Sequence, residues 1–247
     1  TAEITSDILS YDVNVISYCK EALHKLYLLS DFDRAVQLAK IFIDAGVDPN
    51  QQIEPHRRVP IHETARSANI ALAELLIEHG ANIFALDRYD HNVLHFAAFE
   101  GADKMCEFLL SRGVSPNQQG SRGTSLHYAI EGSHRKRSKT GKRPLNYTQT
   151  IEILLTAGCN ITAINTKNNI ALDIIFVCNC DPACDEDTYR VNIPLLKFLL
   201  DITPAKAINY AHLLTTAGAC EKFDGVLSAV MLITDCIIEA YRRGVRK

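Results

Sequence analysis

Histidine is the first residue type of this 247-residue chain to consider for chemistry, because its side chain can ligate a metal or transfer protons. His62, His95 and His127 each follow a Leu or Ile and precede an Ala-containing segment, at spacings of 33 and 32 residues. If each one sits in its own packed helical unit, neighbouring imidazoles lie about 10 Å apart. That distance is too long for two of them to bind one metal ion, so the spacing argues against a shared metal site.

Cysteine is the second residue type with chemical potential, and three thiols fall close together at Cys178, Cys180 and Cys184. A structural zinc site uses four ligands in spaced pairs, and no fourth Cys or His lies near these three in the sequence. We therefore favour a reduced, acidic loop over 178–187 and expect no bound metal. Its four carboxylates are candidates to pair with the basic segment described below.

Catalytic motifs are absent from the sequence. Gly141-Lys142 lacks the preceding Gly of a phosphate-binding loop, because Lys136 occupies that position. There is no His-Glu-x-x-His, Gly-x-Ser-x-Gly or Gly-x-Gly-x-x-Gly pattern, and no strand pattern on which a catalytic sheet could be built. We predict that the protein is not an enzyme and uses no cofactor or small-molecule substrate. An enzyme would need a centre in the C-terminal segment, where Cys220, Cys236 and His212 are the only candidates.

Composition limits the classes of partner. The formal net charge is −3, which gives the whole molecule no attraction to nucleic acid or to an anionic membrane. No apolar run approaches the ~20 residues of a membrane span, and the first residues lack the pattern of a signal peptide. We expect reduced thiols and a cytoplasmic or nuclear location. The missing initiator Met favours a fragment of a longer protein.

A repeated pattern supplies the elements that position these residues. The sequences Val59-Pro60-Ile61-His62-Glu63-Thr64-Ala65, Asn92-Val93-Leu94-His95-Phe96-Ala97-Ala98 and Thr124-Ser125-Leu126-His127-Tyr128-Ala129 recur in register. Each is followed by an aliphatic pair and a glycine, at Gly80, Gly113 and Gly158, with an earlier copy ending at Gly46. The pattern predicts a turn, a short helix, and a second helix that ends at a left-handed glycine. Single units of this size cannot bury their apolar faces, so they must stack.

The two in-phase motifs resemble the ankyrin repeat, with its Thr-Pro-Leu-His-x-Ala-Ala and Leu-Leu-x-x-Gly-Ala sequences and its 33-residue period. The resemblance implies an all-α solenoid of five or six helix-turn-helix repeats, in which each motif histidine bonds backbone groups of the neighbouring turn. The first repeat is degenerate, with His24 in the motif position, and the fifth has Asp173 there, so we expect the fifth to pack less regularly. The predicted divisions are a lead-in at 1–15, repeats at 16–50, 51–83, 84–116, 117–162 and 163–203, and a helical cap or atypical sixth repeat at 204–247.

A basic insertion lengthens the fourth predicted repeat between its two helices. Six of its residues are basic, and it has no aliphatic side chain to bury, so we expect a solvated loop. A loop that only keeps the chain soluble is one interpretation; a nuclear-import signal or a contact for an acidic partner is the other. The six residues are Arg135, Lys136, Arg137, Lys139, Lys142 and Arg143.

The resemblance also implies where a partner binds, because ankyrin proteins usually hold partners in the concave groove formed by the turn tips and first helices. On the third repeat these positions are Arg88, Tyr89, His91, Phe99 and Glu100; on the second they are His56, Arg58 and Arg66; on the fifth they are Thr166 and Lys167. Exposed aromatic and arginine side chains dominate interface energies, which makes Tyr89 and Phe99 the leading pair. The alternative is that both pack against the adjacent repeat. The fourth turn, rich in glycine, offers little.

Together these features favour a non-catalytic scaffold or adaptor that binds a protein or peptide partner. The alternative is a regulatory ankyrin module of a larger signalling protein, transcription regulator, channel or pathogen effector.

Overall fold

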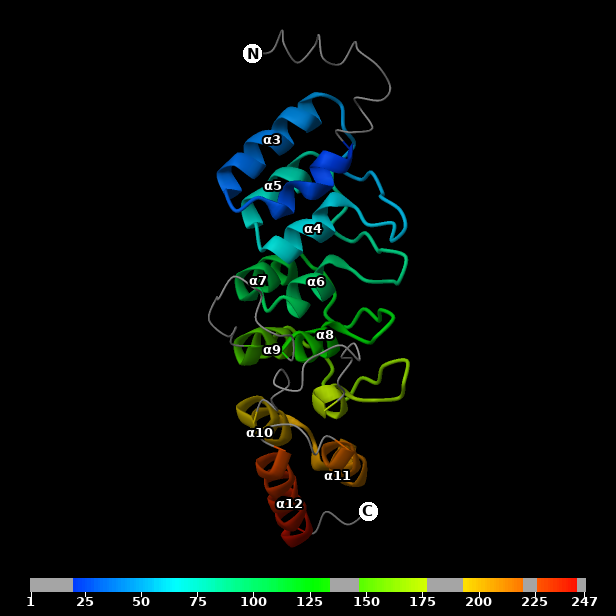
Figure 1. Cartoon of the computed structure of the whole chain (residues 1–247), viewed down its shortest axis with the longest axis vertical. Coiled ribbons are helices and arrows are strands. Elements are labelled where there is room, and N and C mark those ends of the chain that lie inside the picture. Colours follow the sequence, from blue (N-terminus) through cyan, green and yellow to red (C-terminus); the bar gives the residue numbers. More distant parts are fainter. Residues whose placement is uncertain (1–19, 134–146, 177–192, 220–225, 244–247) are drawn as a thin grey trace.

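The computed structural model describes residues 20–133, 147–176, 193–219 and 226–243, and these residues form a stack of helix pairs (Figure 1). The predicted all-α solenoid is confirmed. Residues 20–25 are helical, and they are followed in order by η1 (Leu26–Leu28), α3 (Phe32–Asp44), α4 (Pro60–Ser67), α5 (Ile70–Glu78), α6 (Val93–Phe99), α7 (Asp103–Ser111), α8 (Ser125–Ser133), α9 (Tyr147–Thr156), η2 (Ala171–Phe176), α10 (Ile193–Ile202), η4 (Ala205–Ala207), α11 (Tyr210–Ala219) and α12 (Val226–Arg242).

Helices at equivalent positions stack on one another and form two columns (Figure 1). The first helices α4, α6 and α8, continued by η2, form the inner column, and α3, α5, α7, α9 and α10 form the outer one. Between repeats the chain leaves the columns as a hairpin, and the hairpins project from one side of the stack in Figure 1. Antiparallel bridges such as Ile53 to Arg58 and Ile164 to Ile170 close these hairpins.

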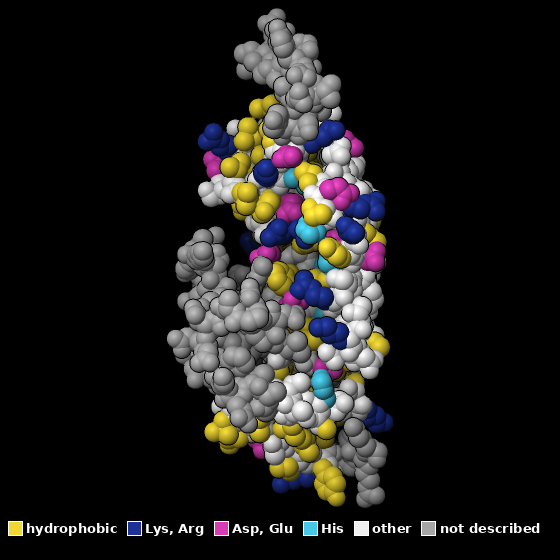
Figure 2. Space-filling model, turned by 45° about the vertical axis from the view of Figure 1, so that its right-hand side comes forward, with side chains coloured by type: hydrophobic (Ala, Val, Ile, Leu, Met, Phe, Trp, Pro, Cys, Tyr) yellow, Lys and Arg dark blue, Asp and Glu magenta, His cyan; other side chains and the backbone are white. Residues whose placement is uncertain are grey.

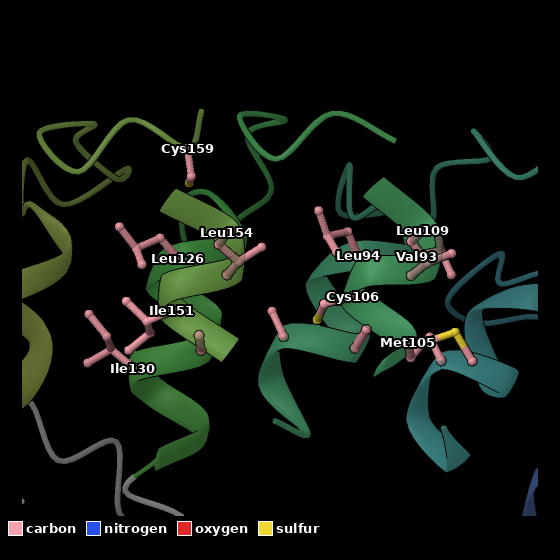
Figure 3. Packing of buried hydrophobic residues seen from close by; sticks show 14 of the residues in the cluster. Val93, Leu94, Met105, Cys106, Leu109, Leu126, Ile130, Ile151, Leu154 and Cys159 are labelled. Carbon is pink, nitrogen blue, oxygen red and sulfur yellow. The ribbon is translucent and has the colours of Figure 1, made fainter. Parts of the chain in front are cut away.

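One apolar core runs between the columns and through the stack. Leu94, Leu126 and Ile130 on first helices and Leu109 and Leu154 on second helices are each 0 % exposed, and Figure 3 shows such side chains pointing into the space between the helices. Because every repeat contributes to one continuous cluster, each repeat depends on its neighbours for burial.

Glycines end the second helices as the sequence predicts. Gly46, Gly80, Gly113 and Gly158 have φ between 83° and 88°, in the left-handed region that glycine adopts without penalty. Each therefore turns the chain sharply from the outer column toward the next hairpin.

The fifth repeat departs from the others. Its first helix is the 3-10 helix η2, and Asp173 accepts a hydrogen bond from Ile170 N at 2.9 Å through one carboxylate oxygen. The other oxygen is buried and has no hydrogen-bond partner among the described residues, and burial raises the pKa of this carboxyl. The predicted irregularity of this repeat is confirmed, because a carboxylate cannot donate the hydrogen bond that a histidine makes here.

Both insertions lie outside the described residues: the basic one falls within 134–146, and the acidic one, with Cys178, Cys180 and Cys184, within 177–192. The described cysteines Cys106, Cys159 and Cys236 are free thiols. At the C-terminal end α11 and α12 pack as a further helix pair. The repeat boundaries within 16–203, and the choice between a cap and a sixth repeat, stay predictions.

Candidate functional site

The motif histidines are structural, as predicted. In His62, His95 and His127, Nδ1 accepts a hydrogen bond from the backbone N–H three residues earlier, at 3.1–3.2 Å. Nε2 of the same residues donates to a carbonyl oxygen of the following repeat: Ala85 O, Gly123 O and Asn169 O, at 3.1–3.2 Å. His24 of the degenerate first repeat bonds Gln51 O in the same way, at 2.9 Å. Each ring therefore joins the start of a first helix to the hairpin of the following repeat.

Hydrogen bonds also join the hairpin tips to one another. Arg88 N donates to His56 O at 2.8 Å, and Ser121 N donates to Tyr89 O at 3.0 Å. The Thr166 hydroxyl continues this series by donating to Ser121 O at 2.9 Å. Four successive tips therefore form one continuous edge on the side of the stack from which the hairpins project.

Tyr89 is the central exposed side chain of this edge. It is 41 % exposed, and its ring centroid lies 5.8 Å from that of His56 and 5.7 Å from that of His91. The neighbouring Arg88 is exposed and bonds Pro55 O at 3.4 Å. Tyr89 thus presents a ring that its neighbours already hold in place, which lowers the entropy cost of binding.

Arginines on aromatic rings form the floor beside Tyr89. The Arg58 guanidinium lies 4.8 Å from the Phe96 centroid, and that of Arg66 lies 5.3 Å from the Tyr27 centroid. Both also pair with the nearly buried Glu63, at 3.5 and 3.1 Å. Since the carboxylate and rings hold one side of each guanidinium, both arginines are pre-oriented.

Arg122, on the hairpin tip of the fourth repeat, has a similar set of contacts. Its guanidinium lies 4.9 Å from the Tyr128 centroid and 5.9 Å from that of Phe99, and it forms an ion pair with Glu131. In Figure 2 Lys and Arg side chains recur along the middle of this face, with histidine and hydrophobic side chains between them.

His91 was predicted to contact a partner from the surface of the turn, but its side chain is buried. It is 6 % exposed, its Nδ1 lies 3.0 Å from Asp87 Oδ2, and its Nε2 lies 2.9 Å from Ser121 Oγ and also meets the Tyr128 hydroxyl. The ring therefore links the third and fourth repeats from inside. The preceding residue, Asp90, has a left-handed φ of 61°.

Asp87 is the buried anion that holds this link. Burial alone would raise the pKa of its carboxyl, but hydrogen bonds from the His91 ring and from the backbone N–H groups of Tyr89 and His91 outweigh burial, so the pKa lies below its usual value. Arg58 Nε lies 3.6 Å from the same carboxylate. Asp87 thus connects the Arg58 guanidinium to the tip that carries Tyr89 and His91.

The other predicted contact residues divide by exposure. His56, Arg58 and Arg66 are half-buried on the concave side, in the contacts described above. Phe99 and Glu100 are half-buried at the end of α6, and the Phe99 ring lies 6.5 Å from that of Tyr128. Phe99 therefore packs against the next repeat, which was the alternative interpretation of this residue. The basic residues from Arg135 to Arg143 lie outside the described residues.

Several concave residues did not emerge from the sequence. Glu63, Phe96, Tyr128 and Ile174 each follow the motif residue of a repeat, and the first three contact the arginines of the floor. The repeat register could have identified them, because equivalent positions share a face. Arg122 was missed because the glycines on either side of it indicated a turn with little to offer a partner.

A family model described as ankyrin repeats, in three copies, matches residues 26–120. This match and the homologous ankyrin-repeat relatives support the ankyrin-repeat resemblance of the sequence. Ankyrin repeats are generally protein–protein interaction modules and are typically non-catalytic.

The curated relatives that this chain is similar to come from a plant, a virus and a bird. The chain is 29 % identical over 98 residues to the E3 ubiquitin-protein ligase KEG of Arabidopsis thaliana, which covers 39 % of this chain and 6 % of the ligase. It is 24 % identical over 111 residues to a putative ankyrin repeat protein of fowlpox virus, covering 45 % of this chain and 18 % of the viral protein. It is 24 % identical over 154 residues to the nuclear factor NF-kappa-B p105 subunit of Gallus gallus, and the match covers 56 % of this chain and 14 % of that subunit. The chain thus spans less than a fifth of the length of each of these relatives.

No helix among the described residues is long and apolar enough to cross a membrane.

Proposed function

We propose that this chain is a non-catalytic scaffold or adaptor that binds a protein or peptide partner along its concave face. The observation that carries the proposal is the exposed Tyr89, held between His56 and His91 and flanked by Arg58 and Arg88. Tyrosine and arginine are the residue types enriched among binding hot spots. Because the rings and carboxylates around them are already in place, little ordering remains to be done when a partner binds.

A regulatory module within a longer signalling protein is the second candidate. Two of the relatives, a ubiquitin-protein ligase and a subunit of a nuclear factor, motivate this candidate. Under this proposal the groove binds a segment of the same protein or of its regulator. A location in the cytoplasm or nucleus is part of both proposals.

The test is capture of a binding protein by the wild-type chain and by an Arg88→Ala/Tyr89→Ala variant. Both side chains are exposed, so the variant keeps the core intact, and circular dichroism checks the fold. We expect affinity for the captured protein to fall at least thirtyfold, about 2 kcal/mol, as for a hot spot. Tyr241→Ala is the matched control, since Tyr241 is 79 % exposed on α12 at the far end of the stack. Equal affinity for the groove variant and the control would contradict a site at Tyr89.

A further inference from the structure

A small polar pocket opens between the fourth and fifth hairpin tips, next to the edge that carries Tyr89. We call it the Arg122–Lys167 pocket; its lining includes Ser121, Arg122, Glu131, Thr166, Lys167 and Ile174. The sequence predicted that the turn of the fourth repeat would contribute little to partner binding, because it is rich in glycine.

The two cations of the pocket are not balanced by its one carboxylate. Arg122 pairs with Glu131, whose side chain is 17 % exposed, whereas the Arg122 side chain is 47 % exposed. Lys167 is exposed and has no ion-pair partner in the part of the chain that the structure describes. The lining therefore carries an excess of one positive charge, and that charge faces the solvent.

The Arg122 guanidinium and the backbone that carries Lys167 are held in place before any ligand binds. The Tyr128 ring lies under the Arg122 guanidinium at 4.9 Å. On the fifth tip, Asn165 Oδ1 accepts hydrogen bonds from the backbone N–H groups of Lys167 and Asn169, at 2.9 and 3.0 Å. The Thr166 hydroxyl ties this tip to Ser121 O. The Arg122 guanidinium is therefore a pre-organised donor, and charge-assisted hydrogen bonds from it favour a charged ligand group over a neutral one.

We propose that the Arg122–Lys167 pocket binds a carboxylate side chain of an extended acidic segment that lies along the concave groove. The ammonium and the free edge of the guanidinium supply the donors, and Ile174 supplies an apolar wall for the methylene groups of a Glu or Asp. This proposal rests on the proposed function and names the chemistry of its partner. An extended chain advances about 3.3 Å per residue, so three to six residues connect the Tyr89 position to the pocket across one or two repeats of ~10 Å.

The probe is a library of random twelve-residue peptides displayed on phage and selected against the whole chain. We expect the selected peptides to be enriched in Glu and Asp and to lose binding to the Arg88→Ala/Tyr89→Ala variant. One selected peptide is then compared with its Glu→Gln form by titration calorimetry. We expect the wild-type chain to prefer the Glu form about tenfold, and high salt to weaken that preference.

Two pocket variants and one control then test whether the preference for the Glu form arises in the Arg122–Lys167 pocket. In Lys167→Ala and in Arg122→Gln, we expect the tenfold preference for the Glu form to be lost. The Lys167 side chain makes no hydrogen bond or ion pair within the described ranges, so this variant remains informative if Arg122→Gln is unstable. Lys104→Ala, which removes an exposed lysine from the outer helix α7, is expected to retain the tenfold preference.

The outcomes separate the two proposals. If binding depends on Tyr89 but the Glu preference survives in both pocket variants, or if no acidic enrichment occurs, the pocket proposal is wrong and the proposed function stands. A phosphoserine peptide that binds more tightly than the Glu form would make phosphate the ligand and overturn the carboxylate assignment. Recovery of no peptide that depends on Tyr89 would count against both proposals.

Discussion

Asp87 illustrates how a single buried charged residue can organise an exposed surface. Its side chain is 0 % exposed, yet it accepts hydrogen bonds from Tyr89 N at 2.8 Å and His91 N at 3.0 Å and faces the Arg58 guanidinium. The exposed Tyr89 and the half-buried Arg58 are therefore positioned by one anion that a partner never touches. A buried charge with several partners is costly to remove singly, because the remaining groups stay buried and unpaired.

Replacing Asp87 with asparagine tests this role. The carboxylate of Asp87 now accepts hydrogen bonds from several donors, and the amide nitrogen of an asparagine would face one of these donors. Arg58 would also lose one of its two carboxylate partners and keep only Glu63. We expect a loss of roughly 1–3 kcal/mol in the free energy of unfolding, measured by urea denaturation. Asp90→Asn is the matched control: Asp90 is exposed with a left-handed φ of 61°, which Asn tolerates well, so its stability should change little. Equal effects of the two substitutions would show that Asp87 does not organise the tip.

Among the helices, glycine serves two different purposes in this stack. Gly113 follows α7 with a φ of 83°, and a Cβ atom there would meet no atom within 4 Å, so only its backbone conformation needs glycine. Gly132 lies within α8, and a Cβ atom there would fall 1.9 Å from Phe99 O on α6. The close packing of these first helices therefore depends on the missing side chain.

Alanine at the two glycines should separate these purposes. Gly113→Ala should cost about 1 kcal/mol, the penalty for a non-glycine residue in the left-handed region. Gly132→Ala should cost roughly 3 kcal/mol, because α6 and α8 must move apart and the backbone atom in the way cannot rotate aside. Urea midpoints at one pH compare the variants. A Gly132→Ala protein no less stable than Gly113→Ala would mean that α6 and α8 are not packed so closely.

Across the molecule as a whole, the buried histidines make stability depend on pH. Burial lowers the pKa of His62 and of His95 to about 4, and it also lowers that of His24 and His127. The unfolded chain, in which histidine titrates near 6.5, binds more protons than the folded chain between pH 6.5 and 4. The free energy of unfolding therefore falls as the pH is lowered through this window.

We expect acidification from pH 6.5 to pH 5 to remove roughly 1.5 kcal/mol per strongly shifted histidine. Urea denaturation at a series of pH values measures the slope. We expect His95→Gln to reduce the slope of the free energy of unfolding against pH by the contribution of one titrating group. His79→Gln, which changes an exposed histidine, should leave this slope unchanged. Identical slopes in all three proteins would contradict a neutral, buried His95.

The repeat could be predicted from the amino-acid sequence without any structure. The spacing of the motif histidines, the glycines after each second helix and the apolar positions between them depend on local backbone conformation and on contacts between adjacent units, which recur in every copy. For the same reason the irregular fifth repeat could be identified from Asp173 alone.

The division of side chains between the groove surface and the interior became visible only in the folded stack. His91 and Tyr89 are two residues apart on one turn, yet His91 points inward because Asp87, Ser121 and Tyr128 come together from two repeats to bind it. The Arg122–Lys167 pocket likewise combines tips that are more than forty residues apart in the chain. Such groupings depend on long-range packing between particular side chains, and a repeat pattern, which specifies only what all copies share, carries no information about them.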